Sequence, residues 1–232
     1  MSPVRVSYYS DVLCVWAYAA ERRLEELVQT FGDRISIDAH VCSVFPDAWG
    51  KIEAKWTARG GFDGFNRHLN EVARMFSHIE VHDRLWLDTR PRTSASAHLF
   101  LKAVEIVERE QDGRGSRPRP YLDRLSTRAT WAMRRAFFAQ ALDISDWRVH
   151  TDIADDLGID YGKVDDKIRS SEAVARLVVD YDQSRKHGVE GSPTYIMNDG
   201  RQKLFGNVGY RLLEANVQEL LRRPSEGEAS WC

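Results

Sequence analysis

The sequence predicts an α/β protein in which a small mixed sheet is built from both ends of the chain and a long helical block separates its two parts. Three observations predict this arrangement. The first 43 residues follow a strand, helix, strand pattern. Helical periodicity without strand signals fills about residues 50–190, and a hairpin followed by a helix ends the folded part of the chain.

The opening segment contains two predicted strands and the helix between them. Residues 4–9 alternate and are rich in β-forming side chains, which predicts a strand. Apolar side chains recur every three or four positions over 13–31, and Gly32 ends this predicted amphipathic helix. Ile35, Ile37, Ala39 and Val41 then alternate with polar neighbours, which predicts the second strand. A connection of this length implies a parallel pair with a right-handed crossover.

Helices are predicted throughout the middle block. Periodicity indicates helices over 94–111 and 121–142, a shorter one capped by 143–145 that ends at Gly158, and another capped by 170–171 that ends at Gly188. Residues 112–120 contain two prolines and alternating arginines, so we expect an exposed loop without a function of its own.

The last segment returns to strands. Residues 194–197 and 203–205 are separated by an Asn-Asp-Gly turn signal, which predicts a β-hairpin. Apolar positions between 212 and 221 predict a final helix. We expect the polar residues 224–232 to form a flexible tail.

Composition excludes several classes of function. The 232 residues include 33 basic and 35 acidic side chains, and a net charge of −2 does not favour a nucleic-acid or membrane partner. No stretch approaches the ~20 apolar residues of a membrane span. Cys14, Cys42 and Cys232 are too far apart to suggest a metal site or a disulfide framework. This cysteine usage is typical of a reducing compartment, so we expect a cytoplasmic protein that binds no metal.

Three motifs resemble segments of one family. The segment Ser10-Asp-Val-Leu-Cys-Val-Trp-Ala17, after the first strand, resembles the Cys-Pro-Trp-Cys active-site segment of FrnE-like members of the DsbA family. Residues 188–195, GVEGSPTY, are similar to the family's Gly-Val-x-Gly-Val-Pro-Thr-Phe segment, and residues 141–146 resemble its link between insertion helices. The resemblance implies a thioredoxin-like domain at 1–49 and 189–223, and a helical insertion domain at 50–188.

The resemblance also implies site residues. Cys14 takes the place of the nucleophile, Pro193 that of the cis-proline facing it, and Ser192 supplies the backbone before this proline. A thiol at a helix N-terminus meets unpaired N–H groups, which favour the thiolate. We expect Asp11 to cap the helix, although its charge would oppose thiolate formation if it faced Cys14. Trp16 is expected to line either the substrate surface or the core.

The departure from the family motif limits the chemistry. Ala17 occupies the position of the second cysteine, so no internal disulfide forms there and Cys14 acts as a single thiol. We interpret Cys42 as structural and Cys232 as inert, although a resolving role for either stays open.

Three functional interpretations remain. The first is a monothiol oxidoreductase that forms a mixed disulfide with glutathione or a protein thiol. The second is a glutathione-dependent enzyme resembling 2-hydroxychromene-2-carboxylate isomerases or kappa-class transferases, and the third is a non-catalytic binding module. We expect no tightly bound cofactor, glutathione as a candidate co-substrate, a small-molecule or peptide thiol as substrate and, by analogy with glutathione-dependent relatives, a homodimer.

Overall fold

The structure is a computed structural model that describes residues 3–113 and 119–222. Within these ranges every strand and most helices lie where the sequence predicts them. The tail predicted at 224–232, which includes Cys232, lies outside the described residues, and so does most of the predicted loop at 112–120.

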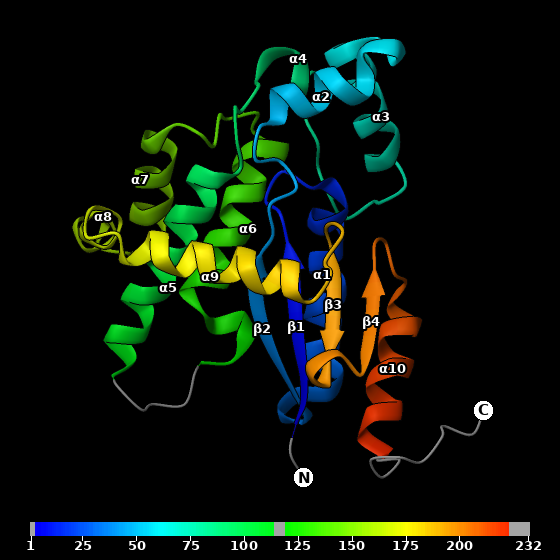
Figure 1. Cartoon of the computed structure of the whole chain (residues 1–232), viewed down its shortest axis with the longest axis vertical. Helices are drawn as coiled ribbons and strands as arrows, with labels where there is room; N and C mark the ends of the chain where they lie inside the picture. Colours follow the sequence, from blue (N-terminus) through cyan, green and yellow to red (C-terminus); the bar gives the residue numbers. More distant parts are fainter. Residues whose placement is uncertain (1–2, 114–118, 223–232) are drawn as a thin grey trace.

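The sheet contains four strands drawn from both ends of the chain (Figure 1). They are β1 (Val4–Ser10), β2 (Ile35–Val41), β3 (Thr194–Met197) and β4 (Gln202–Phe205), in the order β2-β1-β3-β4. As predicted, β1 and β2 are parallel, whereas β3 runs antiparallel to β1 and to β4. The register places Tyr8 of β1 between Ala39 of β2 and Tyr195 of β3.

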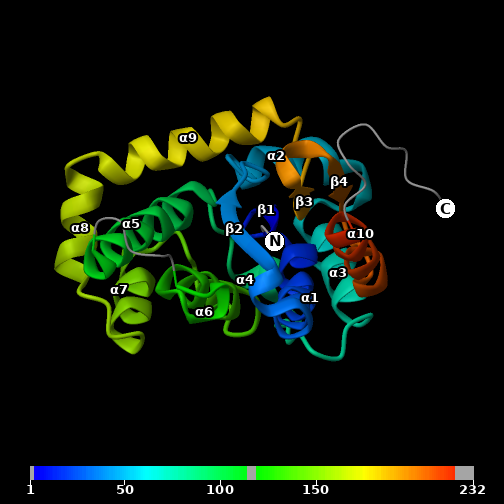
Figure 2. The ribbon, with the colours of Figure 1, turned by 90° about the horizontal axis from the view of Figure 1, so that it is seen from below.

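Helices cover the two faces of this sheet. The helices α1 (Val15–Phe31) and α10 (Tyr210–Arg222) lie on one side, whereas α9 (Glu172–Lys186) crosses the other side (Figure 2). Alternate side chains of β1, including Val6 and Tyr8, pack with leucines of α1 and α10 in one apolar cluster. Tyr9 faces the opposite way and packs with Cys42 and Ile196. Two short 3-10 turns, η1 (Gly32–Arg34) and η4 (Asn198–Gly200), complete this part.

The segment between β2 and β3 contains helices and no strand among its described residues. Its central helix, α5 (Ala95–Asp112), packs against α6, α8 and α9. The remaining elements are α2 (Ala48–Trp56), η2 (Thr57–Arg59), α3 (Gly61–Ala73), α4 (Leu85–Asp88), η3 (Tyr121–Asp123), α6 (Leu125–Phe138), α7 (Trp147–Asp156) and α8 (Tyr161–Arg169). The architecture is therefore a thioredoxin-like α/β fold with a helical insertion, as the sequence predicts.

Several helix boundaries differ from the prediction. The helix predicted over 121–142 ends at Phe138, because Ala141 adopts a left-handed backbone conformation (φ 54°) that turns the chain. Asp146, and not the segment 143–145, caps α7 by accepting a hydrogen bond from Arg148 N. Ser171 also has a positive φ and makes no side-chain cap. The helix α8, which Asp160 caps, is not predicted by the sequence pattern.

A buried ion-pair network fixes α9 against the sheet and α5. Asp180 of α9 accepts hydrogen bonds from Val41 N at 3.0 Å and from the His40 ring at 3.0 Å, and its other ion pair is with Lys102 Nζ at 2.6 Å. Burial disfavours the charged carboxylate. The His40 hydrogen bond and the Lys102 charge outweigh burial and hold the pKa of Asp180 well below its usual value. This stabilisation is therefore present above about pH 4 and lost in acid.

We predict that Asp180→Ala lowers the free energy of unfolding by about 3 kcal/mol, because it leaves a buried lysine and a strand N–H short of a partner. Urea denaturation measures this loss. The matched control is Asp182→Ala on the same helix, which removes an exposed ion pair with Arg185 and should cost less than about 1 kcal/mol. Equal losses in the two variants would contradict the account.

Candidate active site

Cys14 lies at the start of α1, immediately after the turn that follows β1. It is the N-cap residue, with an extended backbone, and its carbonyl accepts hydrogen bonds from Ala17 N and Tyr18 N. The Cys14 N–H donates to Asp11 O at 3.1 Å, which closes the turn. Cys14 is only 7% exposed, so the thiol lies beneath the surface in this state.

The loop before β3 approaches this thiol from the other end of the chain. Cys14 Sγ donates to Ser192 O at 3.1 Å, and the Ser192–Pro193 peptide bond is cis. The Ser192 hydroxyl accepts a hydrogen bond from Asp11 N at 2.9 Å. Two hydrogen bonds therefore join the Cys14 motif to the Ser192–Pro193 motif, both of which the sequence predicts for the site.

The Asp11 side chain stabilises the turn between β1 and α1 that carries Cys14. Its carboxylate is completely buried and accepts hydrogen bonds from Leu13 N, Val44 N and Phe45 N, each at 2.9 Å, and from Ser94 Oγ at 2.8 Å. The first turn of α1 makes no side-chain cap. The expected helix-capping role is therefore wrong, and Asp11 instead ties the Cys14 turn to the loop after β2 and to the start of α5.

His98 is a residue of this network that the sequence analysis missed. Its Nε2 accepts a hydrogen bond from Val12 N at 3.3 Å and lies 3.8 Å from Asp11 Oδ1, while Nδ1 is 3.0 Å from the Tyr181 hydroxyl. Burial lowers the pKa of His98, so the ring is neutral and Nε2 can accept. No sequence signal distinguishes this side chain from an ordinary buried histidine on the inner face of a helix.

Trp16 and Ala17 have different environments. Ala17 is completely buried, so its side chain offers no surface to a substrate in this state. Trp16 is half-buried and packs edge-on against Phe76, with 6.1 Å between ring centroids, at the border of the helical core. Both residues contribute backbone N–H groups that stabilise a Cys14 thiolate.

Burial decides the charge state of the thiol. It raises the pKa of Cys14, and the hydrogen bonds to Ser192, Ala17 and Trp16, which lower it, do not compensate. The negative charge of Asp11 adds to the increase. The expected thiolate at the helix N-terminus is therefore not the resting form, because the local helix effect is weaker than desolvation.

A cavity of about 370 Å³ opens beside the loop that carries the cis-proline. Its lining includes Cys42, Lys51, Arg185, Glu190 and Gly191. Burial raises the pKa of Cys42, and the charges of Asp11 and Cys14 raise it further. Cys14 and Cys42 are both free thiols.

Lys51 is one of the two basic side chains, with Arg185, that line this cavity. Its Nζ donates to Val44 O at 2.6 Å and lies 4.2 Å from the centre of the Phe45 ring. Burial lowers the pKa of Lys51, whereas the charges of Asp11 and Cys14 act to raise it. A Cys14 thiolate and the Lys51 ammonium therefore stabilise each other.

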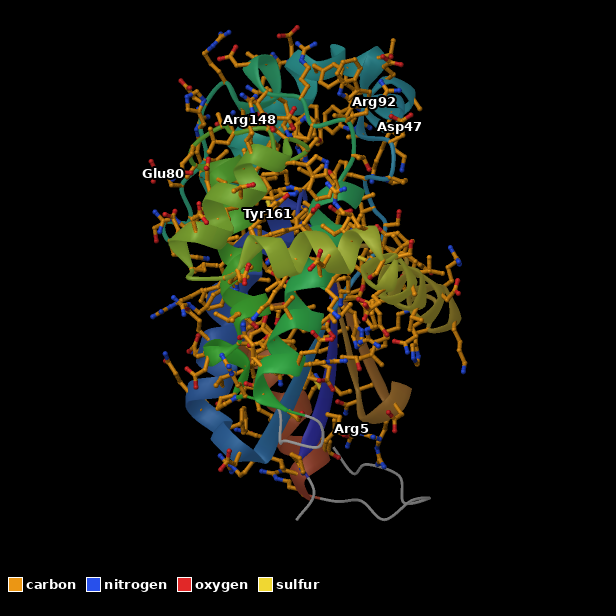
Figure 3. The ribbon with its side chains drawn as sticks, turned by 90° about the vertical axis from the view of Figure 1, so that its left-hand side faces the viewer. Arg5, Asp47, Glu80, Arg92, Arg148 and Tyr161 are labelled. Atoms are coloured by element: carbon orange, nitrogen blue, oxygen red, sulfur yellow. The ribbon has the colours of Figure 1, made fainter. Side chains whose placement is uncertain are left out.

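The helix that presents Lys51 is fixed at its first turn. Asp47 caps α2 by accepting from Gly50 N at 3.2 Å, and Arg92 lies beside Asp47 at 3.5 Å (Figure 3). Backbone hydrogen bonds from Ala48 N to Arg92 O and from Ser94 N to Phe45 O join the same two loops.

Residues 3–113 and 119–222 contain neither a metal-binding cluster nor a membrane-spanning helix. The described residues contain no group of three or more histidine, cysteine or acidic side chains that could hold a metal ion. In the same residues, no helix has the length and apolar character needed to cross a bilayer.

Comparisons with known proteins agree with the fold. The family model of the DSBA-like thioredoxin domain matches residues 122–218. No curated protein matches the chain. This match confirms the resemblance to the DsbA-like thioredoxin domain that the sequence predicts, and similar solved structures share the fold.

Three solved structures span nearly the whole chain. A proposed protein disulfide isomerase from Nitrosomonas europaea is 15% identical with a TM-score of 0.73, covering 96% of this chain and 100% of that one. A 2-hydroxychromene-2-carboxylate isomerase is 16% identical with a TM-score of 0.64, covering 97% and 100%. The cytosolic disulfide reductase DsbM from Pseudomonas aeruginosa, solved with GSH, is 19% identical with a TM-score of 0.66, covering 94% and 100%.

We predict that Cys14 is alkylated by iodoacetamide with an apparent pKa above the usual ~8.5, because burial dominates its environment. The rate is measured against pH in a Cys42→Ser, Cys232→Ser background. Lys51→Met should raise this apparent pKa further by removing a nearby positive charge. Lys55→Met, on the exposed side of the same helix, is the matched control and should change it less.

Two results would contradict this electrostatic account. One is a Cys14 titration clearly below ~8.5. The other is an equal effect of Lys51→Met and Lys55→Met.

Proposed function

We propose that this chain, which has a thioredoxin-like fold and resembles the DsbA family, is a thiol-disulfide oxidoreductase that acts through Cys14 alone. One observation carries the proposal: Cys14 Sγ lies 3.1 Å from Ser192 O, at a helix start that faces a cis-proline loop. This loop presents backbone beside the sulfur, where an extended thiol substrate can pair with it. Ala17 supplies no second thiol.

The proposed reaction has two exchange steps. The Cys14 thiol first loses its proton, and the thiolate attacks one sulfur of a substrate disulfide. A bond forms between Cys14 and that sulfur, the substrate disulfide breaks, and the leaving thiolate takes up a proton. A glutathione thiolate then attacks the sulfur bound to Cys14, which forms a new disulfide outside the protein and releases Cys14.

Deprotonation is the step that the surroundings must assist. The resting thiol is neutral because it is buried, while the Trp16 and Ala17 N–H groups and the Lys51 ammonium all favour the thiolate. We propose that substrate entry shifts Cys14 Sγ away from Ser192 O and toward these groups.

The small cavity suits glutathione as co-substrate. Glutathione carries two carboxylates and one ammonium group, and the cavity lining offers Lys51 and Arg185 against Glu190. Gly191, also in the lining, immediately precedes the Ser192–Pro193 pair. DsbM, a structural neighbour, has been solved with GSH. The free thiols and this cytosolic neighbour also support the proposal of a cytoplasmic location.

A second candidate is a glutathione-dependent isomerase. The neutral Cys14 thiol, which donates a hydrogen bond in the resting state, favours it. In such an enzyme Cys14 would donate to a bound glutathione thiolate without forming a disulfide. The fold is shared with a 2-hydroxychromene-2-carboxylate isomerase.

We predict that Cys14→Ser lowers kcat/KM for reduction of a glutathionylated peptide by more than about 100-fold, because a hydroxyl cannot replace the sulfur nucleophile. The assay follows glutathione disulfide formation. Cys42→Ser, which alters the neighbouring buried thiol, is the matched control and should retain most of the activity.

The pattern of losses separates the candidates. Loss of activity in Cys42→Ser but not in Cys14→Ser would place the reactive thiol elsewhere. Two results together would favour the isomerase over the oxidoreductase. The wild-type protein would reduce no disulfide, and the wild-type protein and the Cys14→Ser variant would isomerise a glutathione-linked substrate equally well.

A further inference from the structure

A second and larger cavity lies away from Cys14. It measures about 740 Å³ and is bounded by β1, β2, α5, η3 and α6. In Figure 2, β2 is the strand nearest to α5 and α6. The lining of this cavity includes neither Cys14 nor the Ser192–Pro193 pair. It is therefore separate from the proposed thiol site.

The cavity exists because one core-facing position of β2 is small and uncovered. Ile37, Ala39 and Val41 alternate onto the same face of the sheet, and Ile37 and Val41 are buried as the pattern predicts. Ala39 is instead exposed, and it lines the cavity. Its methyl group, beside Tyr8 in the register, leaves open the space that a larger β-forming side chain would fill.

Three buried hydrogen-bond donor atoms of lining residues have no partner among the described residues: the Tyr8 hydroxyl, Arg134 Nε and Arg176 Nε. Tyr8 and Arg134 are each 1% exposed, whereas Arg176 is half-buried. An unsatisfied buried donor destabilises a fold, so a group of them in one cavity calls for an acceptor from outside the chain. Arg134 is held in place, because Nη1 donates to Glu21 and Nη2 to Ser10 Oγ, both at 2.8 Å.

Part of the lining is apolar and is suited to an apolar ligand body, whereas acidic side chains such as Glu105 and Glu108 also line the cavity. Val12, Leu101, Ile106 and Tyr121 contribute apolar surface from three segments, the turn after β1, α5 and η3. Other basic side chains of the lining, such as the buried Lys102 and the partly exposed Arg119, are engaged in ion pairs with acidic neighbours. The volume falls in the range of cavities that bind drug-sized molecules.

We propose that this cavity binds a small apolar carboxylate, an aromatic or aliphatic acid whose carboxylate accepts hydrogen bonds from Tyr8 Oη and Arg134 Nε. The permanently charged guanidinium makes its bond to a carboxylate stronger than one to a neutral carbonyl. Burial raises the pKa of Tyr8, so its hydroxyl remains protonated as a donor.

The test measures binding of 2-naphthoate and decanoate to the full-length protein by isothermal titration calorimetry. We expect saturable binding of at least one acid, and weaker binding of the neutral 2-naphthamide. Tyr8→Phe should weaken binding of the acid about tenfold through loss of one hydrogen bond. It should not lower the melting temperature of the free protein, because the lost hydroxyl has no partner among the described residues.

A blocking variant and a site control complete the test. Ala39→Trp fills the cavity from an exposed position and should abolish binding, whereas alkylation of Cys14 should leave binding unchanged. The proposal is overturned if neither acid binds, if 2-naphthamide binds as tightly as 2-naphthoate, or if Ala39→Trp retains the wild-type affinity. Loss of binding on Cys14 alkylation would also overturn it, by placing the acid in the thiol site.

Discussion

The buried Asp11 carboxylate is the interaction on which the geometry of the site depends. It accepts hydrogen bonds from Leu13, from the loop after β2 and from Ser94, while the Asp11 N–H donates to Ser192 Oγ. Segments from the start, middle and end of the sequence thus meet at one residue. A buried carboxylate is costly unless its hydrogen bonds are satisfied, so these segments are held in one arrangement.

The same enclosure creates a conflict at Cys14. A helix N-terminus favours a thiolate, but the packing that aligns Cys14 with Ser192 also removes it from water, and desolvation prevails. A resting thiol that is neutral and hydrogen-bonded is protected from unselective oxidation. Reaction then requires that the substrate expose the Cys14 sulfur or promote its deprotonation. The Lys51 ammonium favours the resulting thiolate.

Local patterns predicted the parts of the fold that local forces determine. Alternation predicted β1 and β2, the Asn-Asp-Gly turn predicted the hairpin, and the connection length predicted parallel pairing. The two motifs that meet at Cys14 and Ser192 could be selected from the sequence, because the resemblance fixes their order. The resemblance supplied no information about the side chains that contact the turn before Cys14, such as Ser94 and His98.

The remaining features arise from tertiary packing. His98 joins the Val12 N–H to Tyr181 across two helices, and no spacing in the sequence marks it. Asp11 is predicted from its position as a helix cap, but in the fold its carboxylate accepts hydrogen bonds from the loop after β2. Ala39 alternates as a core residue, yet it is exposed and lines the larger cavity. Strand alternation identifies the face on which a residue lies but not what packs against that face.

The most direct measurement is the intact mass of the protein after exposure to oxidised glutathione, with peptide mapping of any adduct. A single-thiol mechanism predicts one glutathione on Cys14, which reduced glutathione removes at a rate proportional to its concentration. A disulfide between Cys14 and Cys42, or the absence of any adduct on Cys14, would contradict it.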